Sequence, residues 1–180
     1  IRDLESAEIA IQSALTGHLM LSTIHTNSAS GAIPRFLSMG VKPFLLAPAL
    51  NAVIGQRLLR KLCEKCKKPA QPDETQAKKI QEVMATLSPD AGMTFDMAKA
   101  TWFGPGGCEA CHEGYKGRMG IYEVLIMSKE LEKSILGEKV SEYDIQDLGV
   151  KQGMITMAQD GLMKAAEGIT SISEVFRVTE

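Results

Sequence analysis

Two Cys-x-x-Cys pairs are the part of this sequence whose residue types and spacing are best suited to chemistry. Cys63 and Cys66 form the first pair, Cys108 and Cys111 form the second, and the 180 residues contain no other cysteine. A two-residue gap lets both thiolates of a pair face one centre, and two pairs supply the four soft ligands of tetrahedral Zn²⁺. The spacing therefore predicts one tetrathiolate zinc site. Two disulfides or a redox-active pair are the alternative interpretations.

We expect this zinc to be structural, because four sulfur ligands leave no coordination position open for water or substrate. The site would close the base of a long excursion from Lys67 to Gly107. A structural zinc binds with roughly 10–16 kcal/mol of apparent free energy, enough to organise a lobe too small for its own core. His112 follows the second pair, and with four thiolates available we expect it to be a solvent-exposed neighbour and not a ligand.

The overall composition is ordinary for a globular protein of one or two domains, with 44% hydrophobic and 23% charged residues. A formal net charge of −2 gives no whole-chain electrostatic reason to bind nucleic acid. No apolar run approaches the roughly 20 residues that a membrane span needs, and no signal peptide pattern is present. These features predict a cytoplasmic protein.

The first 40 residues have the pattern of an α/β layer. The chain opens on Ile1 and not on Met, so we expect further chain upstream. A helix capped by Asp3 should end at Gly17. The apolar run His18–Ile24 is typical of a strand buried in a parallel sheet, and a second helix follows from about Ser30 to Met39. Helix, strand and helix in this order indicate an α/β fold.

The middle of the chain contains a strand on each side of the cysteine excursion. For Phe44–Leu62 we expect a helix and then a strand, although periodicity alone does not decide between them. Asp73 and Gln76 have the spacing of a capping box and predict one helix within the excursion. Arg118–Ile126 alternates as a strand does, and we expect it to pair with the strand that precedes Cys63.

The tail has the most regular pattern. Glycines that end helices alternate with Ser or Thr residues at helix N-cap positions. This pattern predicts four short helices in series, with N-caps at Ser128, Ser141, Thr156 and Ser171.

Four segments together resemble one known family, the traffic ATPases of type IV pilus assembly and type II secretion. These segments are IRDLESAEIAIQSALTGHLMLSTIHTN, GQRLLRKLCEKC, GGCEACHEGYKGRMGIYEVL and GLMKAAEGITSISEVFRVT. Ile1-Arg2-Asp3 is similar to the end of the family's Walker B segment, and LTGHLMLSTIHTN is similar to its histidine box. The four cysteines and the closing GITSxxEVxRVT pattern resemble the assembly or export branch.

The resemblance implies an α/β fold with three parts. Residues 1–62 would be the C-terminal portion of a RecA-like ATPase domain, containing the end of Walker B and the histidine box. Residues 63–112 would be an inserted zinc-binding tetracysteine lobe. Residues 113–180 would be a strand followed by a C-terminal helical bundle.

The resemblance also implies an activity. The parent protein would be a cytoplasmic homo-hexamer, held at the inner membrane through its partners, that binds ATP and Mg²⁺ and drives an inner-membrane platform protein. Type IV pilus assembly is the first interpretation and type II secretion export is the alternative. The family's P-loop is absent, since no G-x-x-x-x-G-K-[ST] pattern occurs, so we expect this chain alone to be inactive. A sheet without its central strands would also leave an open edge, which predicts self-association.

By the same resemblance, His25 is the candidate catalytic residue, at the carboxyl end of its strand, where it would approach the γ-phosphate. The alternative is that His25 only caps the loop that follows. Four further residues are candidates for nucleotide binding: His18, Arg2, Asp3 and Arg57. Alternatives remain for three of them. Asp3 could serve only as a helix cap, His18 as a structural hydrogen-bonding group, and Arg57, like Arg60, as a partner in salt bridges.

A function of another class is a zinc-ribbon module that binds nucleic acid or protein, suggested by the cysteine pairs and a basic run. The run consists of Lys61, Lys65, Lys67 and Lys68. The acidic total and the few aromatic residues argue against nucleic acid as the partner. A third interpretation is that the zinc lobe and the tail form a docking surface for a membrane partner's cytoplasmic domain.

Overall fold

The computed structural model describes residues 1–137 and 140–180, and it divides into two compact units. Unit 1 comprises Ile1–Gly55 and Val124–Met154, and unit 2 comprises Gln56–Glu123 and Ile155–Glu180. Each unit is thus built from two stretches that are distant in the sequence. Within the described ranges, no helix is long and apolar enough to cross a membrane.

Unit 1 is made mainly of short helices. Both α1 and α5 pack against α3, and α6 packs against α5. These helices and their neighbour α2 span Leu4–Leu15 (α1), Ala32–Ser38 (α2), Pro43–Ala49 (α3), Lys129–Leu136 (α5) and Glu142–Lys151 (α6). Their shared core includes Ile11, Ile33, Leu46, Leu125, Leu131 and Ile145.

The first helix begins and ends where the sequence predicts. The Asp3 carboxylate accepts a hydrogen bond of 2.8 Å from the backbone N–H of Ser6. This bond lowers the pKa of Asp3, and the Ser6 hydroxyl adds to the effect. Gly17 follows the C-cap Thr16 and has a φ of +94°, which a glycine adopts without a Cβ penalty. The next helix, α2, carries Pro34 in its first turn, where proline is tolerated.

The predicted buried strand at His18–Ile24 is not formed. Residues 18–26 have no regular secondary structure, and Leu19 and Leu21 are 83% and 85% exposed. A strand requires a neighbour to accept and donate its backbone hydrogen bonds. No strand of the described ranges pairs with this run, so Leu19 and Leu21 remain uncovered, whereas Ile24 packs against the core of unit 1.

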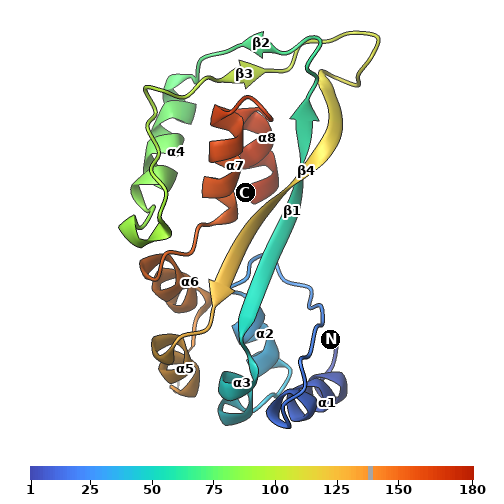
Figure 1. Ribbon diagram of the computed structural model, residues 1–180, viewed down its shortest axis with the longest axis vertical. Coiled ribbons are helices and arrows are strands. Elements are labelled where there is room, and N and C mark those ends of the chain that lie inside the picture. The colour runs from blue at the N-terminus through green and yellow to red at the C-terminus, as the bar shows by residue number, and fades with distance from the viewer. Residues whose placement is uncertain (138–139) are drawn as a thin grey trace. The chain divides into compact units, whose positions relative to one another are not determined.

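The predicted pairing of strands around the cysteine excursion is confirmed. Strand β1 (Ala52–Leu62) pairs with β4 (Tyr115–Ile126) in a two-stranded sheet, and the two run in opposite directions in Figure 1. A second, smaller sheet joins β2 (Lys68–Pro69) to β3 (Phe103–Gly104) in antiparallel register. The preceding helix α3 also agrees with the expectation of a helix and then a strand in Phe44–Leu62.

Unit 2 joins the excursion to the tail helices through a common core. Helix α4 (Glu74–Ala85), with the predicted capping box at Asp73 and Gln76, packs against α7 (Met157–Ala166), which packs against α8 (Ile172–Thr179). A short 3₁₀ turn, η1, spans Pro89–Ala91. The excursion's Ile80 and Trp102 share one cluster with Leu162 and Val175. The excursion therefore has apolar support besides the cysteine site, and the compact units divide the chain elsewhere than at the predicted boundaries.

The four predicted tail helices are all present, each with the expected N-cap. Helices α5, α6, α7 and α8 follow Ser128, Ser141, Thr156 and Ser171, and each cap side chain accepts a backbone N–H of its first turn. The pair α5 and α6 belongs to unit 1, whereas α7 and α8 belong to unit 2. The single C-terminal bundle is therefore not confirmed.

Candidate metal centre

The four cysteines gather as the sequence predicts. Their Sγ atoms all lie within 4.8 Å of one another. Cys63 and Cys108 are separated by 3.9 Å, and Cys111 lies 3.6 Å from both Cys66 and Cys108. A tetrahedron with Zn–S bonds of about 2.3 Å has edges of about 3.8 Å, so these spacings fit one zinc ion. All four are free thiols and none forms a disulfide.

Local backbone hydrogen bonds shape each cysteine pair into a turn. The N–H groups of Cys66 and Lys67 donate to the carbonyl of Cys63, at 3.1 and 2.9 Å. In the second pair, the N–H of Cys111 donates to the carbonyl of Cys108 at 3.2 Å. The N–H of Cys63 donates to Gly114 at 2.8 Å and joins the two turns. Backbone hydrogen bonds thus shape the two turns that carry the four sulfur atoms.

The thiols differ in acidity. Burial raises the pKa of Cys66 to about 12, with hydrogen bonds from the other three thiols adding to it. Burial alone would raise the pKa of Cys111 as well, but hydrogen bonds with Cys108, Cys66 and the backbone of Gly114 lower it to about 7. Since metal binding requires thiolates, an ion at this site would displace the remaining thiol protons.

His112 is a solvent-exposed neighbour, as predicted. Its side chain is 91% exposed, and its backbone exchanges hydrogen bonds with Tyr115 at 3.1 and 2.9 Å. The cluster of possible ligands consists of the four cysteines without it.

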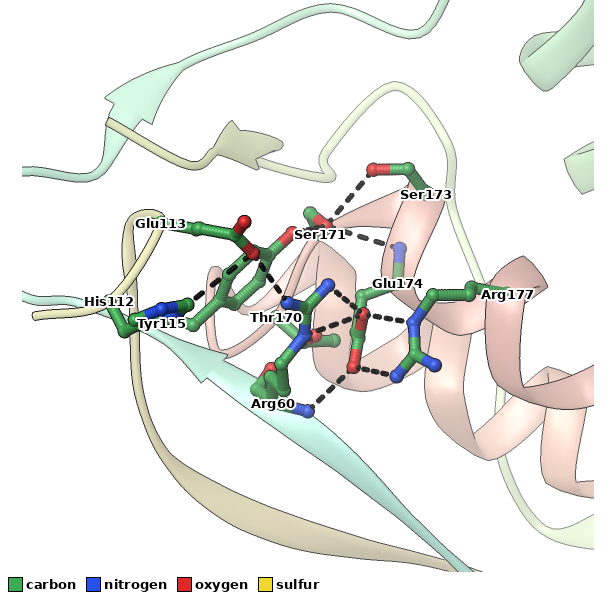
Figure 2. Close-up of polar contacts among 9 residues, drawn as sticks. All are labelled: Arg60, His112, Glu113, Tyr115, Thr170, Ser171, Ser173, Glu174 and Arg177. Atoms are coloured by element: carbon green, nitrogen blue, oxygen red, sulfur yellow. Dashed lines mark hydrogen bonds and ion pairs between the residues drawn. The ribbon is translucent and has the colours of Figure 1, made fainter. Parts of the chain in front are cut away.

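Charged side chains gather around the buried Glu174 in what we name the Arg60–Glu174 cluster (Figure 2). Arg60 lies three residues before Cys63 in the sequence. Glu174 is 1% exposed. Its carboxylate accepts from the backbone N–H of Arg60 at 3.0 Å and from the Arg60 Nε and Nη2 atoms at 3.0 and 2.8 Å. Arg177 donates from Nε at 2.8 Å and from Nη2 at 2.6 Å. The cluster also contains Glu113, Tyr115 and Ser171.

The cluster keeps Glu174 ionised. Burial alone would raise the pKa of this carboxyl, but the hydrogen bonds from Arg177 and Arg60 outweigh it and lower the pKa to about 2. The hydrogen bond to Glu174 in turn raises the pKa of both Arg60 and Arg177. A buried charge of this kind is tolerated because it is paired and fully hydrogen-bonded. The salt-bridge interpretation of Arg60 is therefore confirmed.

Sequence reasoning had no means of pairing Glu174 with Arg60. The two residues are 114 positions apart, and the sequence offers Glu174 only as the residue three positions after the N-cap Ser171 and as a letter of the family pattern. The available signal was the N-cap at Ser171, which places Glu174 in the first turn of α8, where an acidic residue is favourable.

The histidines predicted to act at a nucleotide are both exposed and lie in unit 1. The His18 Nδ1 atom lies 3.2 Å from the Thr16 hydroxyl and 3.3 Å from the Ser13 carbonyl, which is the structural role considered for it. An apolar groove of about 340 Å³ runs along α1 and residues 20–24, but neither His18 nor His25 lines it.

Of the remaining candidates, Arg2 and Asp3 also lie in unit 1, and both line a shallow surface hollow beside Ser22. Asp3 caps α1, the alternative role considered for it. Arg57 lies on β1 in unit 2.

A family model described as type II/IV secretion system protein matches residues 1–177. The chain belongs to this family. It is 44% identical over 181 residues to the type IV pilus assembly ATPase PilB of Pseudomonas aeruginosa, covering 100% of this chain and 30% of that protein. It is 42% identical over 180 residues to type II secretion system protein E of the same organism, covering 99% and 33%. The type II secretion system protein E of Dickeya dadantii is 45% identical over 183 residues, covering 100% and 33%.

This secretion-family chain spans about a third of the length of the curated relatives it matches. The pilus and secretion relatives are similar to it to nearly the same degree, 44% against 42% and 45%. Sequence identity therefore establishes the family without separating its two branches.

Proposed function

We propose that this chain is the C-terminal part of a hexameric ATPase that couples ATP hydrolysis to type IV pilus assembly. The observation that carries the proposal is the family match over residues 1–177. Relatives named as pilus assembly ATPases, which this chain matches over nearly its whole length, support it. The P-loop and the Walker B glutamate would come from the upstream part of the longer protein. The 42–45% identity to type II secretion proteins E supports protein export as the second candidate.

In this proposal, residues 1–62 contribute the C-terminal portion of a RecA-like domain, and His25 acts at the γ-phosphate of ATP. A hydrogen-bond donor there would stabilise charge on the transferring phosphoryl group and the oxygens around it. The exposure of His25, in a run without regular secondary structure, supports this role because its ring is open to a ligand. His18, Arg2, Asp3 and Arg57 are proposed to assist in binding ATP and Mg²⁺.

The metal in this proposal is one structural Zn²⁺ held by Cys63, Cys66, Cys108 and Cys111. When bound, it supplies a covalent-like crosslink between the two turns and no open coordination position. The proposed partners are five further copies of the protein and an inner-membrane platform protein, which would hold the cytoplasmic ring at the membrane.

ATP hydrolysis by the full-length protein tests the proposal. Wild type, His25→Ala and the control His112→Ala are compared as assembled oligomers with Mg²⁺. We expect His25→Ala to lose about 100-fold or more in kcat, as for removal of a group that stabilises transition-state charge. His112→Ala should retain activity, because its side chain is exposed beside the metal turns.

Three outcomes contradict parts of the proposal. Equal rates in wild type and His25→Ala would remove His25 from the phosphates. A wild-type protein without hydrolysis would favour the zinc-ribbon module, and DNA binding with a steep salt dependence would support that alternative. When the full-length gene is returned to a strain that lacks it, restored protein secretion without restored pili would favour the export branch.

A further inference from the structure

The first cysteine turn is hydrogen-bonded to the loop that precedes α8. Just before the turn, the N–H of Leu62 donates to the carbonyl of Ile169 at 2.8 Å, and the Thr170 hydroxyl donates to the carbonyl of Arg60 at 2.8 Å. Just after Cys66, the Lys67 ammonium donates to the carbonyl of Gly168 at 3.2 Å. The backbone that presents Cys63 and Cys66 is therefore held from both sides by residues 168–170.

The second cysteine turn reaches α8 through side chains (Figure 2). Glu113, two residues after Cys111, accepts from the Nη1 atom of Arg60 at 3.2 Å. Tyr115 shares a hydrogen bond of 2.8 Å with Ser171, the N-cap of α8. The Arg60 guanidinium also lies 4.2 Å from the centre of the Tyr115 ring, a cation–π arrangement.

Arg60 is the one side chain of this set that joins both turns to α8. It lies on β1, three residues before Cys63, and it contacts the second turn through Glu113. Its other N–H groups bind Glu174. The rigid fork of a guanidinium suits this, because it presents several donors in fixed directions to two carboxylates.

The backbone at Glu113 indicates that its carboxylate matters. Its φ is +53°, the only positive value of a non-glycine residue in the described ranges. Glycine adopts this conformation with less strain. A glutamate at such a position retains the side chain that Arg60 binds, at the expense of an unfavourable backbone.

We propose that Arg60, with Glu113 and Glu174, forms the outer shell of the metal centre and makes metal retention depend on the packing of α8. Arg60 is a positioning residue: it holds the two cysteine turns at the spacing that fits one ion. Outer groups that hydrogen-bond directly to metal ligands change metal affinity by about 10–100-fold when removed, and we expect a comparable effect from side chains that fix the turns carrying the ligands. Because coupling is reciprocal, loss of the metal should in turn loosen α8.

The inference rests on the metal centre proposed above and not on ATP hydrolysis. The first measurement is the zinc content of the unaltered full-length protein, expected to be one ion per chain. A protein that retains no zinc would overturn the inference, whereas loss of ATPase activity alone would leave it intact.

The test is the rate at which the zinc-loaded full-length protein releases Zn²⁺ to an excess of colorimetric chelator. The variants are Glu174→Gln and Glu113→Gln, and the control is Lys78→Met. Lys78 pairs with Glu82 at 3.9 Å within its own helix, α4, and its side chain is 79% exposed. We expect about 10–100-fold faster release from the two cluster variants and an unchanged rate in the control.

Glu113→Gln keeps the test decisive if Glu174→Gln does not fold, because the Glu113 side chain is 67% exposed. A folded Glu113→Gln protein that releases zinc at the wild-type rate would overturn the proposal. Equal hydrogen-exchange rates of the amides from Val175 to Glu180 in zinc-loaded and zinc-stripped protein would also overturn it. We expect exchange at these amides to become at least 10-fold faster on stripping, with α1 in unit 1 as the internal reference.

Discussion

The contact between α7 and α8 predicts that Gly161→Ala lowers the free energy of unfolding of the wild type but raises that of a Val175→Ala protein. Gly161 lies inside α7, and a Cβ added there would lie 2.7 Å from Val175 Cγ1 and 3.3 Å from Val175 Cγ2. Favourable carbon contacts lie at about 3.5–4.0 Å. Gly161→Ala gains about 1 kcal/mol of helix propensity but incurs about 1–3 kcal/mol for overpacking a buried contact. We expect a net destabilisation of up to about 2 kcal/mol.

The same change should stabilise the protein once Val175 is shortened. In Val175→Ala the remaining Cβ would lie 3.6 Å from the new methyl group, an ordinary van der Waals distance. Only the helix-propensity gain of up to about 1 kcal/mol is then left. Urea unfolding of the wild type, both single variants and the double variant, all zinc-loaded, gives the coupling energy of the cycle. Stabilisation by Gly161→Ala in both backgrounds would refute the close approach of α7 and α8.

Three further outcomes are expected. The lowering of the Glu174 pKa from 4.5 to about 2 corresponds to about 3 kcal/mol of stability at neutral pH, lost as pH falls from about 4.5 towards 2. The free energies of unfolding of wild type and Glu174→Gln, measured in urea, should therefore converge at acid pH. A difference that stays constant with pH would count against the pairing. Ile80→Ala should cost about 2–5 kcal/mol by the same measurement, and Lys78→Ala, at a side chain 79% exposed, should stay within about 0.5 kcal/mol. Cys66→Ser should abolish zinc binding by elemental analysis while His112→Ala retains one ion per chain.

Local sequence signals predicted the features that depend on local chemistry. Helix starts were predictable because a cap such as Asp3 or Asp73 satisfies backbone N–H groups within its own first turn. The cysteine cluster was predictable because the Cys-x-x-Cys spacing itself forms a turn that points both thiols the same way. A single long-range contact, between the two turns, then completes the site. These features need no knowledge of distant packing.

Features that depend on distant partners were not predictable in the same way. The apolar run His18–Ile24 has the composition of a buried strand, but whether it forms one depends on neighbouring strands that the described chain does not supply. Likewise, Ile80 and Trp102 gave no sign that the excursion shares a core with α7 and α8. The Arg60–Glu174 pair required the tail to return to β1 across 114 positions.

The Arg60–Glu174 cluster also determines how unit 2 should respond to heating. Removing the Glu174 carboxylate from water has a hydration cost, and that cost falls as temperature rises because ion hydration has a strongly negative entropy. Hydrophobic stabilisation by the surrounding apolar core levels off over the same range. The cluster should therefore supply a growing share of the stability of unit 2 on warming, so that the penalty for replacing Glu174 is greater near the melting temperature than in the cold.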